Sequence, residues 1–189
     1  MTTLDPKTTA LLVMDMQSAI LDMVPNERDG VIARTSELIT KARDAGVRVI
    51  YVVIGFREGY PEIGAASTSF AFVRGTGRFV EGSAGTEIHP ALAPKPGDIV
   101  VTKRRVSAFT GTDLEVILRT NRIDTLVLSG VATSGIVLST IRHAADADYR
   151  LVVAKDCCAD RDHEVHRVLT EKVFARQATV VRGEEIIVS

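Results

Sequence analysis

The stretch "DTLVLSGVATSGIVLST", residues 124–140, joins two different hydrophobic patterns within one short segment. Its first part, residues 124–130, is a nearly unbroken aliphatic run, which is typical of a buried strand. The segment from Thr133 to Asp148 then has the spacing of a helix. A buried strand that leads directly into a helix is the repeating unit of parallel sheets, so this stretch predicts an α/β fold.

The same kind of apolar run recurs along the chain. The other runs are "TALLVMD" (9–15), "VRVIYVVI" (47–54), "DIVVTK" (98–103), "RLVVAKD" (150–156) and "ATVVR" (178–182). Because these runs are continuously hydrophobic rather than alternating, they suit strands that helices cover on both faces. Between them, helices are expected at residues 31–45, 112–120, 133–148 and 162–176. We therefore predict a three-layer fold whose six-stranded, mostly parallel sheet has the Rossmann-like order 3-2-1-4-5-6.

Residues 55–97 differ from the rest of the chain because they are rich in Gly and Pro and show little periodicity. We expect mostly loop there, with one short helix. A loop of this length inside one domain is typical of a lid, a binding wall or a subunit contact, and a surface excursion without a role is the alternative.

The composition limits the class of protein. The length predicts one domain over residues 1–189, and 23 Lys and Arg against 24 Asp and Glu leave a net charge of −1. The sequence has no cluster of basic residues of the kind that binds a phosphate backbone, so no nucleic-acid partner is expected. No basic leader and no apolar run of about 18 residues occurs, which predicts a cytoplasmic protein without a membrane segment. The adjacent Cys157 and Cys158 suit neither a disulfide framework nor a zinc site, which fits a reducing compartment.

Cofactor and metal motifs are missing from the expected places. No G-x-G-x-x-G follows the first strand and no phosphate-binding loop motif occurs, so no nucleotide cofactor is expected. His163 and His166 in "DHEVHR" lie three residues apart, one short of the H-E-x-x-H zinc motif. We therefore predict no bound metal, with both histidines as exposed or capping residues.

Polar residues at strand ends are the candidates for chemistry, because ligands of parallel sheets bind beyond the carboxyl ends of the strands. Asp15 closes the first strand, Lys103 closes the third, and the fourth leads into Gly130. A carboxyl group at the end of five apolar residues is largely desolvated, which raises its pKa unless a cation lies beside it. Lys103 could be that cation, and the two residues could then form an acid or base whose pKa is adjusted for proton transfer. In the alternative interpretation, Asp15 caps a turn and Lys103 is a solvated member of "KRR".

Three blocks of the sequence resemble successive motifs of the isochorismatase-like, or cysteine hydrolase, superfamily. They are "TALLVMDMQSAIL", "VVTKRRVSAFTGTDLEVILR" and "DTLVLSGVATSGIVLSTIRHAADADYRLVVAKDCCAD". The resemblance covers nearly the whole chain and implies a six-stranded parallel sheet and a homo-oligomer, a dimer or larger. It also implies that Asp15 is the catalytic aspartate and Lys103 the catalytic lysine. The same resemblance implies a cis peptide between Val131 and Ala132, in a turn that aims N–H groups into an oxyanion hole.

The nucleophile of the family's amidases is missing from its place. Their motif has the form G-x-A-T-x-x-C, and counting from Gly130 puts Ile136 at the cysteine position. An isoleucine has no lone pair and cannot form an acyl-enzyme. Ser134 and Ser139 lie on other faces of the expected helix, so we interpret them as helix residues rather than nucleophiles.

Other residues complete the predicted site. Cys157 and Cys158 follow the fifth strand and could approach the crevice, although a small buried side chain is the commoner role of a cysteine. By position, the turn residues Val131, Ala132 and Thr133 are expected to contact a substrate. In the long loop, Phe56 is expected to line a pocket and Arg57 to bind a carboxylate, while anchoring of the loop to the core is the alternative for such aromatic residues.

Two functions of different class follow from these residues. The first is a small-molecule hydrolase in which Asp15 and Lys103 assist attack by water, without a covalent cysteine intermediate. Isochorismatase-type relatives use the aspartate in this way as a general acid on a vinyl ether, although the bulk of Ile136 does not favour isochorismate itself as the substrate. The second is an inactive member of the family that binds a small ligand or a protein partner.

Overall fold

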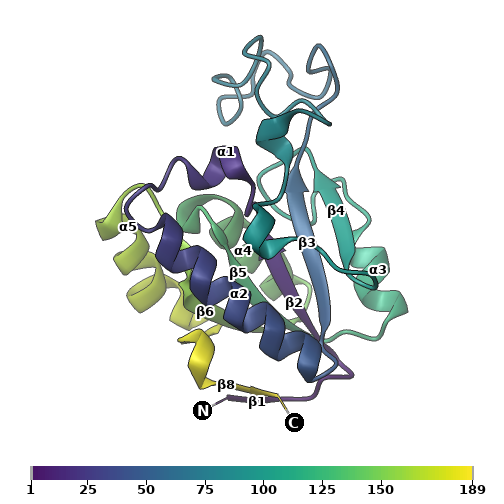
Figure 1. Ribbon diagram of the computed structural model, residues 1–189, viewed down its shortest axis with the longest axis vertical. Helices are drawn as coiled ribbons and strands as arrows, with labels where there is room; N and C mark the ends of the chain where they lie inside the picture. The colour runs from purple at the N-terminus through teal and green to yellow at the C-terminus, as the bar shows by residue number, and fades with distance from the viewer. Residues whose placement is uncertain (1, 189) are drawn as a thin grey trace.

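A six-stranded parallel sheet between layers of helices forms the centre of the computed structural model, which describes residues 2–188 (Figure 1). The strands of this sheet are β2 (Thr9–Met14), β3 (Arg48–Ile54), β4 (Ile99–Lys103), β5 (Thr125–Val131), β6 (Arg150–Ala159) and β7 (Thr179–Val181). Their spatial order is β4-β3-β2-β5-β6-β7, and every neighbouring pair is parallel. The predicted fold class and the strand order 3-2-1-4-5-6 are therefore confirmed.

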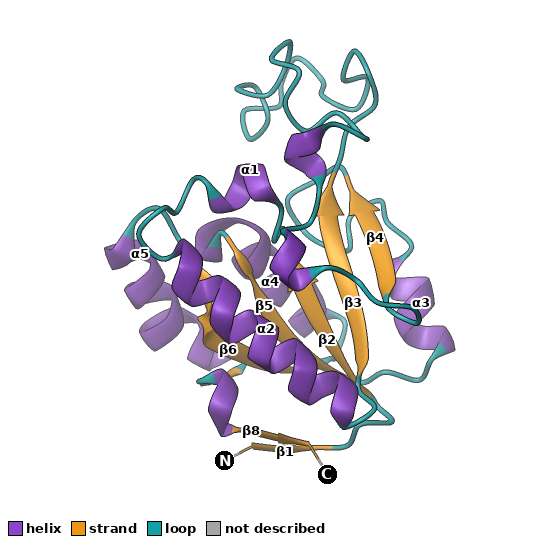
Figure 2. Cartoon of the chain, in the orientation of Figure 1, coloured by secondary structure: helices purple, strands orange, loops and turns teal. Residues whose placement is uncertain are grey.

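Four of the five α-helices of the described chain lie close to the predicted ranges, whereas no helix was predicted at α1 (Figure 2). They are α1 (Ser18–Leu21), α2 (Arg28–Asp44), α3 (Leu114–Thr120), α4 (Leu138–Asp146) and α5 (His163–Val168). A π-helical turn, Thr133–Val137, precedes α4, and α5 continues through a second one, Leu169–Val173, into the 3₁₀ turn Phe174–Arg176. Within residues 2–188, none of these helices has both the length and the apolar character needed to cross a bilayer.

Side chains of β2 point alternately into two separate cores, as the pleat of a strand requires. Leu11 and Val13 pack under α2, whereas Ala10, Leu12 and Met14 pack on the face that α3 and α4 cover. Since all six residues of β2 are buried, this strand is the centre of the fold. The strand is continuously hydrophobic because helices cover both of its faces, as the sequence predicted.

The described chain ends lie side by side at the amino end of the sheet (Figure 1). There β1 (Thr2–Leu4) pairs in parallel with β8 (Ile186–Val188), which follows a 3₁₀ turn, Gly183–Glu185. This two-stranded sheet was not predicted, because three-residue strands carry no readable period. The predicted domain range of 1–189 includes two terminal residues that lie outside the described part of the chain.

The long segment between β3 and β4 rises beyond the carboxyl ends of both strands (Figure 1). It contains two 3₁₀ turns, Ala84–Thr86 and Pro90–Leu92, and otherwise no helix or strand, which differs slightly from the single short helix expected. The segment has a small core of its own, in which the rings of Phe56 and Phe70 meet edge to face with centroids 5.3 Å apart.

Gln17, just after β2, fastens this segment to the sheet. Its side-chain amide donates to the carbonyls of Ile54, at 2.9 Å, and Thr86, at 2.8 Å, and its Oε1 accepts the N–H of Ile54. Gln17 is fully buried, so these bonds satisfy polar groups that water does not reach. The loop therefore has a fixed attachment beside Asp15.

Gly130 makes the closest backbone contact of the central strands. It pairs with Met14, and a Cβ atom built on it would lie 2.5 Å from the Met14 carbonyl oxygen and 2.9 Å from Met14 Cβ. Both contacts are shorter than real Cβ atoms make. Any side chain here would push apart the two strands that end at the predicted site.

Gly130→Ala is therefore expected to lower the free energy of unfolding by about 2 kcal/mol or more, because overpacking against the backbone cannot relax cheaply. Urea unfolding followed by circular dichroism measures the change. Gly64→Ala is the control, since a Cβ there meets nothing within 4 Å. Equal stability losses in the two variants would contradict the proposed close approach.

Candidate active site

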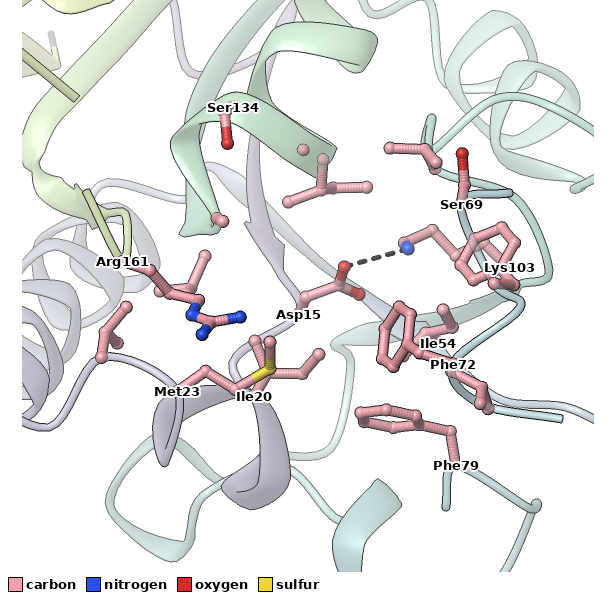
Figure 3. A pocket seen from close by; sticks show the side chains of 18 residues that line it. Asp15, Ile20, Met23, Ile54, Ser69, Phe72, Phe79, Lys103, Ser134 and Arg161 are labelled. Atoms are coloured by element: carbon pink, nitrogen blue, oxygen red, sulfur yellow. Dashed lines mark ion pairs between the residues drawn. The ribbon is translucent and has the colours of Figure 1, made fainter. Parts of the chain in front are cut away.

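A cavity of about 350 Å³ lies beyond the carboxyl ends of β2, β4 and β5. Asp15, Lys103 and Val131 reach it from these strand ends, and the long loop and the segment after β6 supply the other walls (Figure 3). This is the place where an open parallel sheet offers a crevice, because the strand order reverses between β2 and β5.

Asp15 and Lys103 form a buried ion pair inside this cavity. Lys103 Nζ lies 2.9 Å from Asp15 Oδ2, and the two side chains are only 2% and 7% exposed. Lys103 also donates to the Arg105 carbonyl at 3.2 Å. Asp15 Oδ1 has no hydrogen-bond partner among the described residues. One carboxyl oxygen therefore holds the lysine, and the other is buried without a partner in the described chain, at the edge of the cavity.

The backbone turns sharply at Asp15, with φ at 54°, and its N–H donates to the Val52 carbonyl at 2.7 Å. Aspartate is one of the few residues that adopt this left-handed conformation readily. The turn ends β2 and directs the carboxyl group into the cavity instead of along the strand.

Burial raises the pKa of Asp15 above its usual range, and the charge and hydrogen bond of Lys103 oppose this effect without cancelling it. The sequence left open which of the two would prevail. The raised proton affinity suits a carboxyl group that gives and takes a proton during a reaction.

The remaining walls of the cavity are mostly apolar. They include Ile20, Met23, Phe70, Phe72, Phe79 and Ile136. Ile136 is 2% exposed and lies in the same lining as Asp15 and Lys103, so the position that the family resemblance assigns to a thiol presents hydrocarbon. No cysteine belongs to this lining.

Two N–H groups of the turn after β5 are bonded within the protein. The N–H of Ser134 donates to Asp160 Oδ2 at 2.7 Å, and the N–H of Gly135 donates to the Ala132 carbonyl at 3.0 Å. The Val131–Ala132 peptide is cis, as the resemblance implied. Neither N–H is free to hold an oxyanion, so the oxyanion hole expected in this turn is not found at these two groups.

Three residues that the sequence assigned to substrate binding lie outside the cavity lining, whereas Val131 and Ala132 belong to it. Arg57 is exposed, and its guanidinium pairs with Glu62 Oε1 at 2.6 Å. Phe56 is fully buried in the loop core, which is the anchoring alternative. Thr133 is also buried, and its hydroxyl lies 2.8 Å from His166 Nδ1. These three assignments are corrected, because each side chain has found a partner within the protein.

Arg161 lines the cavity and was missed in the sequence. The structure extends β6 to Ala159, three residues beyond the predicted end at Asp156, so Arg161 follows a strand end at the same edge as Asp15. Figure 3 shows its guanidinium directed toward the cavity from the side opposite Phe72. Its position just after the fifth strand of the sheet is the sequence signal that could have identified Arg161 as a site residue.

The two histidines of "DHEVHR" have separate partners. His163 is exposed and lies 2.8 Å from Glu27 Oε1, while the half-buried His166 contacts Thr133. His166 is thus less exposed than predicted. Within residues 2–188, no three His, Cys, Asp or Glu side chains are grouped so that they could hold a metal ion.

Neither cysteine reaches the cavity. Cys157 packs on the α2 side of the sheet and Cys158 on the opposite side. Burial raises the pKa of Cys157 to about 12, with Asp156 adding to the effect, and burial also raises the pKa of Cys158. Since the thiolate is the nucleophilic form, both side chains are inert core residues.

Comparison with known proteins gives a consistent result. A family model described as "Isochorismatase domain" matches residues 9–185. The uncharacterized isochorismatase family protein YecD of Escherichia coli O157:H7 is 35% identical, with 97% of each chain covered. The ureidoacrylate amidohydrolase RutB of Methylobacterium radiotolerans is 34% identical over 81% of this chain and 67% of its own. The crystal structure of an isochorismatase family protein from Burkholderia thailandensis superposes with a TM-score of 0.86 at 30% identity, covering 98% of this chain and 96% of that one.

Lys103→Met is expected to destabilise the protein by about 3 kcal/mol at pH 8 and by less at pH 5. Without the lysine, the two largest effects that oppose burial are lost, and the pKa of Asp15 rises further above the ordinary value of 3.8. The folded state then binds more protons than the unfolded state, so stability falls as pH rises through this window. Urea unfolding at both pH values measures the loss. Lys172→Met, at an exposed site, should show no such pH dependence.

Iodoacetamide is expected to leave the folded protein unmodified at neutral pH, because the buried thiols are almost entirely protonated. Intact-mass spectrometry checks this, and the same reagent in urea should add two carbamidomethyl groups. Rapid labelling of the folded protein would instead identify a reactive cysteine.

Proposed function

Because the chain belongs to the isochorismatase family of hydrolases, we propose that it hydrolyses a small molecule by direct attack of water, using Asp15 and Lys103 and no covalent intermediate. The observation that carries this proposal is the buried Asp15–Lys103 pair in a cavity whose neighbouring wall is Ile136. The pair supplies a proton-transfer group, and Ile136, at the position of the family's cysteine, supplies no nucleophile.

Asp15 acts as the general acid in the proposed reaction. Its raised pKa keeps part of the population protonated, so that the carboxyl group can donate a proton to the substrate. Lys103 stabilises the carboxylate that remains, which favours the transfer. For a vinyl ether, protonation of the vinyl carbon leaves a cationic carbon, which water attacks while its proton returns to Asp15. The resulting hemiketal breaks its bond to the ether oxygen and passes its hydroxyl proton to that oxygen, which releases a carbonyl compound and an alcohol.

Two features favour an acid-sensitive bond, such as a vinyl ether, over an amide as the bond that is cleaved. Acyl transfer requires a nucleophile and donors for an oxyanion, but the N–H groups of Ser134 and Gly135 are bonded within the protein. The relative named ureidoacrylate amidohydrolase makes carbamoyl compounds the second class to test.

The remaining expectations about the protein's setting stay predictions. They are a homo-oligomer of two or more copies, a cytoplasmic location, a small molecule rather than nucleic acid as the partner, and no cofactor.

Asp15→Asn is expected to reduce kcat by about 100-fold or more for whichever substrate is turned over, since removal of a positioned general acid costs this much. A screen over vinyl ethers, carbamoyl compounds and amides, with steady-state kinetics on the wild type and the variant, measures the loss. Asp44→Asn, which alters an exposed carboxyl at the end of α2, is the control and should retain full activity.

The pH dependence identifies the form of Asp15 that acts. For a general acid, kcat/KM should fall as pH rises through the raised pKa of Asp15, and this limb should be lost in Asp15→Asn. A limb that rises instead would show that the carboxylate acts as a base. Tight binding of a substrate-like ligand with no turnover of any class would identify a binding protein and refute hydrolysis.

A further inference from the structure

A second hollow opens directly beside the catalytic cavity. This vestibule has a volume of about 450 Å³ and is lined by Asp22, Met23, Phe72, Arg78 and Arg161. Met23, Phe72 and Arg161 also line the catalytic cavity. The two hollows therefore share three side chains, and a long ligand could occupy both.

The vestibule carries an excess of positive charge. Asp22, its one acidic residue, is already paired with Arg28, whose Nη1 lies 2.7 Å from Asp22 Oδ1. Within residues 2–188, the guanidinium groups of Arg78 and Arg161 have no ion-pair partner and no side-chain hydrogen bond. Two cations thus face one hollow without a counter-charge from the protein.

Asp160 and Asp162 flank Arg161 in the sequence, and neither forms an ion pair with it. Asp162 Oδ1 accepts the N–H groups of Glu164 and Val165 at the start of α5. Asp160 is 6% exposed, and its two oxygens accept the N–H groups of Ser134 and Asp162. Arg161 itself is exposed and lines both hollows, and Figure 3 shows its guanidinium directed toward the catalytic cavity that adjoins the vestibule. Its charge is therefore available to a ligand.

Arg78 and Phe72 make the other wall suited to an amphipathic ligand. The Arg78 guanidinium lies 5.5 Å from the centre of the Phe79 ring, and that ring lines the catalytic cavity. Phe72 lines both hollows and is 57% exposed, so its ring offers an apolar surface to a ligand that spans them. The Phe72 ring and the two guanidinium groups line one hollow, which fits a ligand with a flat or apolar middle and an anionic end.

We propose that the vestibule binds a distal dianionic group of an elongated substrate, either a pair of carboxylates or a phosphate monoester. The apolar middle of the substrate lies against Phe72, and its hydrolysable end reaches Asp15. Two guanidinium groups match two negative charges, because arginine forms forked, charge-assisted hydrogen bonds with carboxylate and phosphate oxygens. The orientation of the substrate rests on the proposed function, whereas the anion site does not.

Binding of three probes that share a phenyl ring tests the site: phenylmalonate, phenyl phosphate and phenylacetate. Isothermal titration at pH 8 and low salt should show that at least one dianion binds about tenfold more tightly than the monoanion phenylacetate. Because both arginines are exposed, each of Arg78→Gln and Arg161→Gln should weaken dianion binding by about fivefold, and added salt should reduce the difference. The preferred dianion identifies the group as a dicarboxylate or a phosphate.

Arg176→Gln is the matched control, since it removes the same charge from an exposed site in the turn after α5. The proposal is overturned if phenylacetate binds as tightly as both dianions, if the Arg78→Gln/Arg161→Gln double variant keeps the preference, or if Arg176→Gln weakens binding equally. These titrations measure binding alone. Dianion binding without hydrolysis of any substrate would refute the proposed function and support the anion site. Hydrolysis without a preference for dianions would support the proposed function and refute the anion site.

Discussion

The burial of one ion pair, Asp15 with Lys103, sets the requirements for the rest of the site. A carboxylate or an ammonium taken out of water alone costs several kcal/mol, so each group is tolerated only because the other lies 2.9 Å away. Their strands are not neighbours, since β3 lies between β2 and β4. Only the shared carboxyl edge of a parallel sheet brings the two side chains together. The pair therefore depends on the strand order and cannot form before β2, β3 and β4 have assembled.

The long segment between β3 and β4 determines the environment of that pair. Its aromatic residues form a core of their own and present Phe70, Phe72 and Phe79 to the cavity, which keeps water away from the carboxyl group. This desolvation is the largest cause of the raised pKa of Asp15. The buried amide of Gln17 ties the segment to the end of β3. Proton affinity at Asp15 is thus a property of the loop as much as of the ion pair.

The turn after β5 has the shape of a reactive corner but lacks its chemical groups. Ile136 presents hydrocarbon to the cavity, and the N–H groups of Ser134 and Gly135 are bonded to Asp160 and Ala132. One relative of the chain is named an amidohydrolase, but the cavity here has no cysteine in its lining, which is why we propose direct attack by water instead. The unpaired Arg161, and beyond it Arg78, extend this cavity toward a charged ligand. The proposed hydrolysis and the proposed anion site occupy adjoining parts of the same surface.

The sequence by itself determined the strand order, the positions of Asp15 and Lys103 at strand ends, and the hydrocarbon at residue 136. These features follow from local hydrophobic period and from motif spacing, which the chain carries along its length. Only the tertiary structure decided that Arg57 pairs with Glu62 outside the cavity, that Phe56 anchors the loop, and that Arg161 enters the site instead. The loop has no period, and the exposure and partners of its side chains depend on segments far away in sequence. Whether a side chain binds a ligand or the protein itself is settled by those long-range contacts.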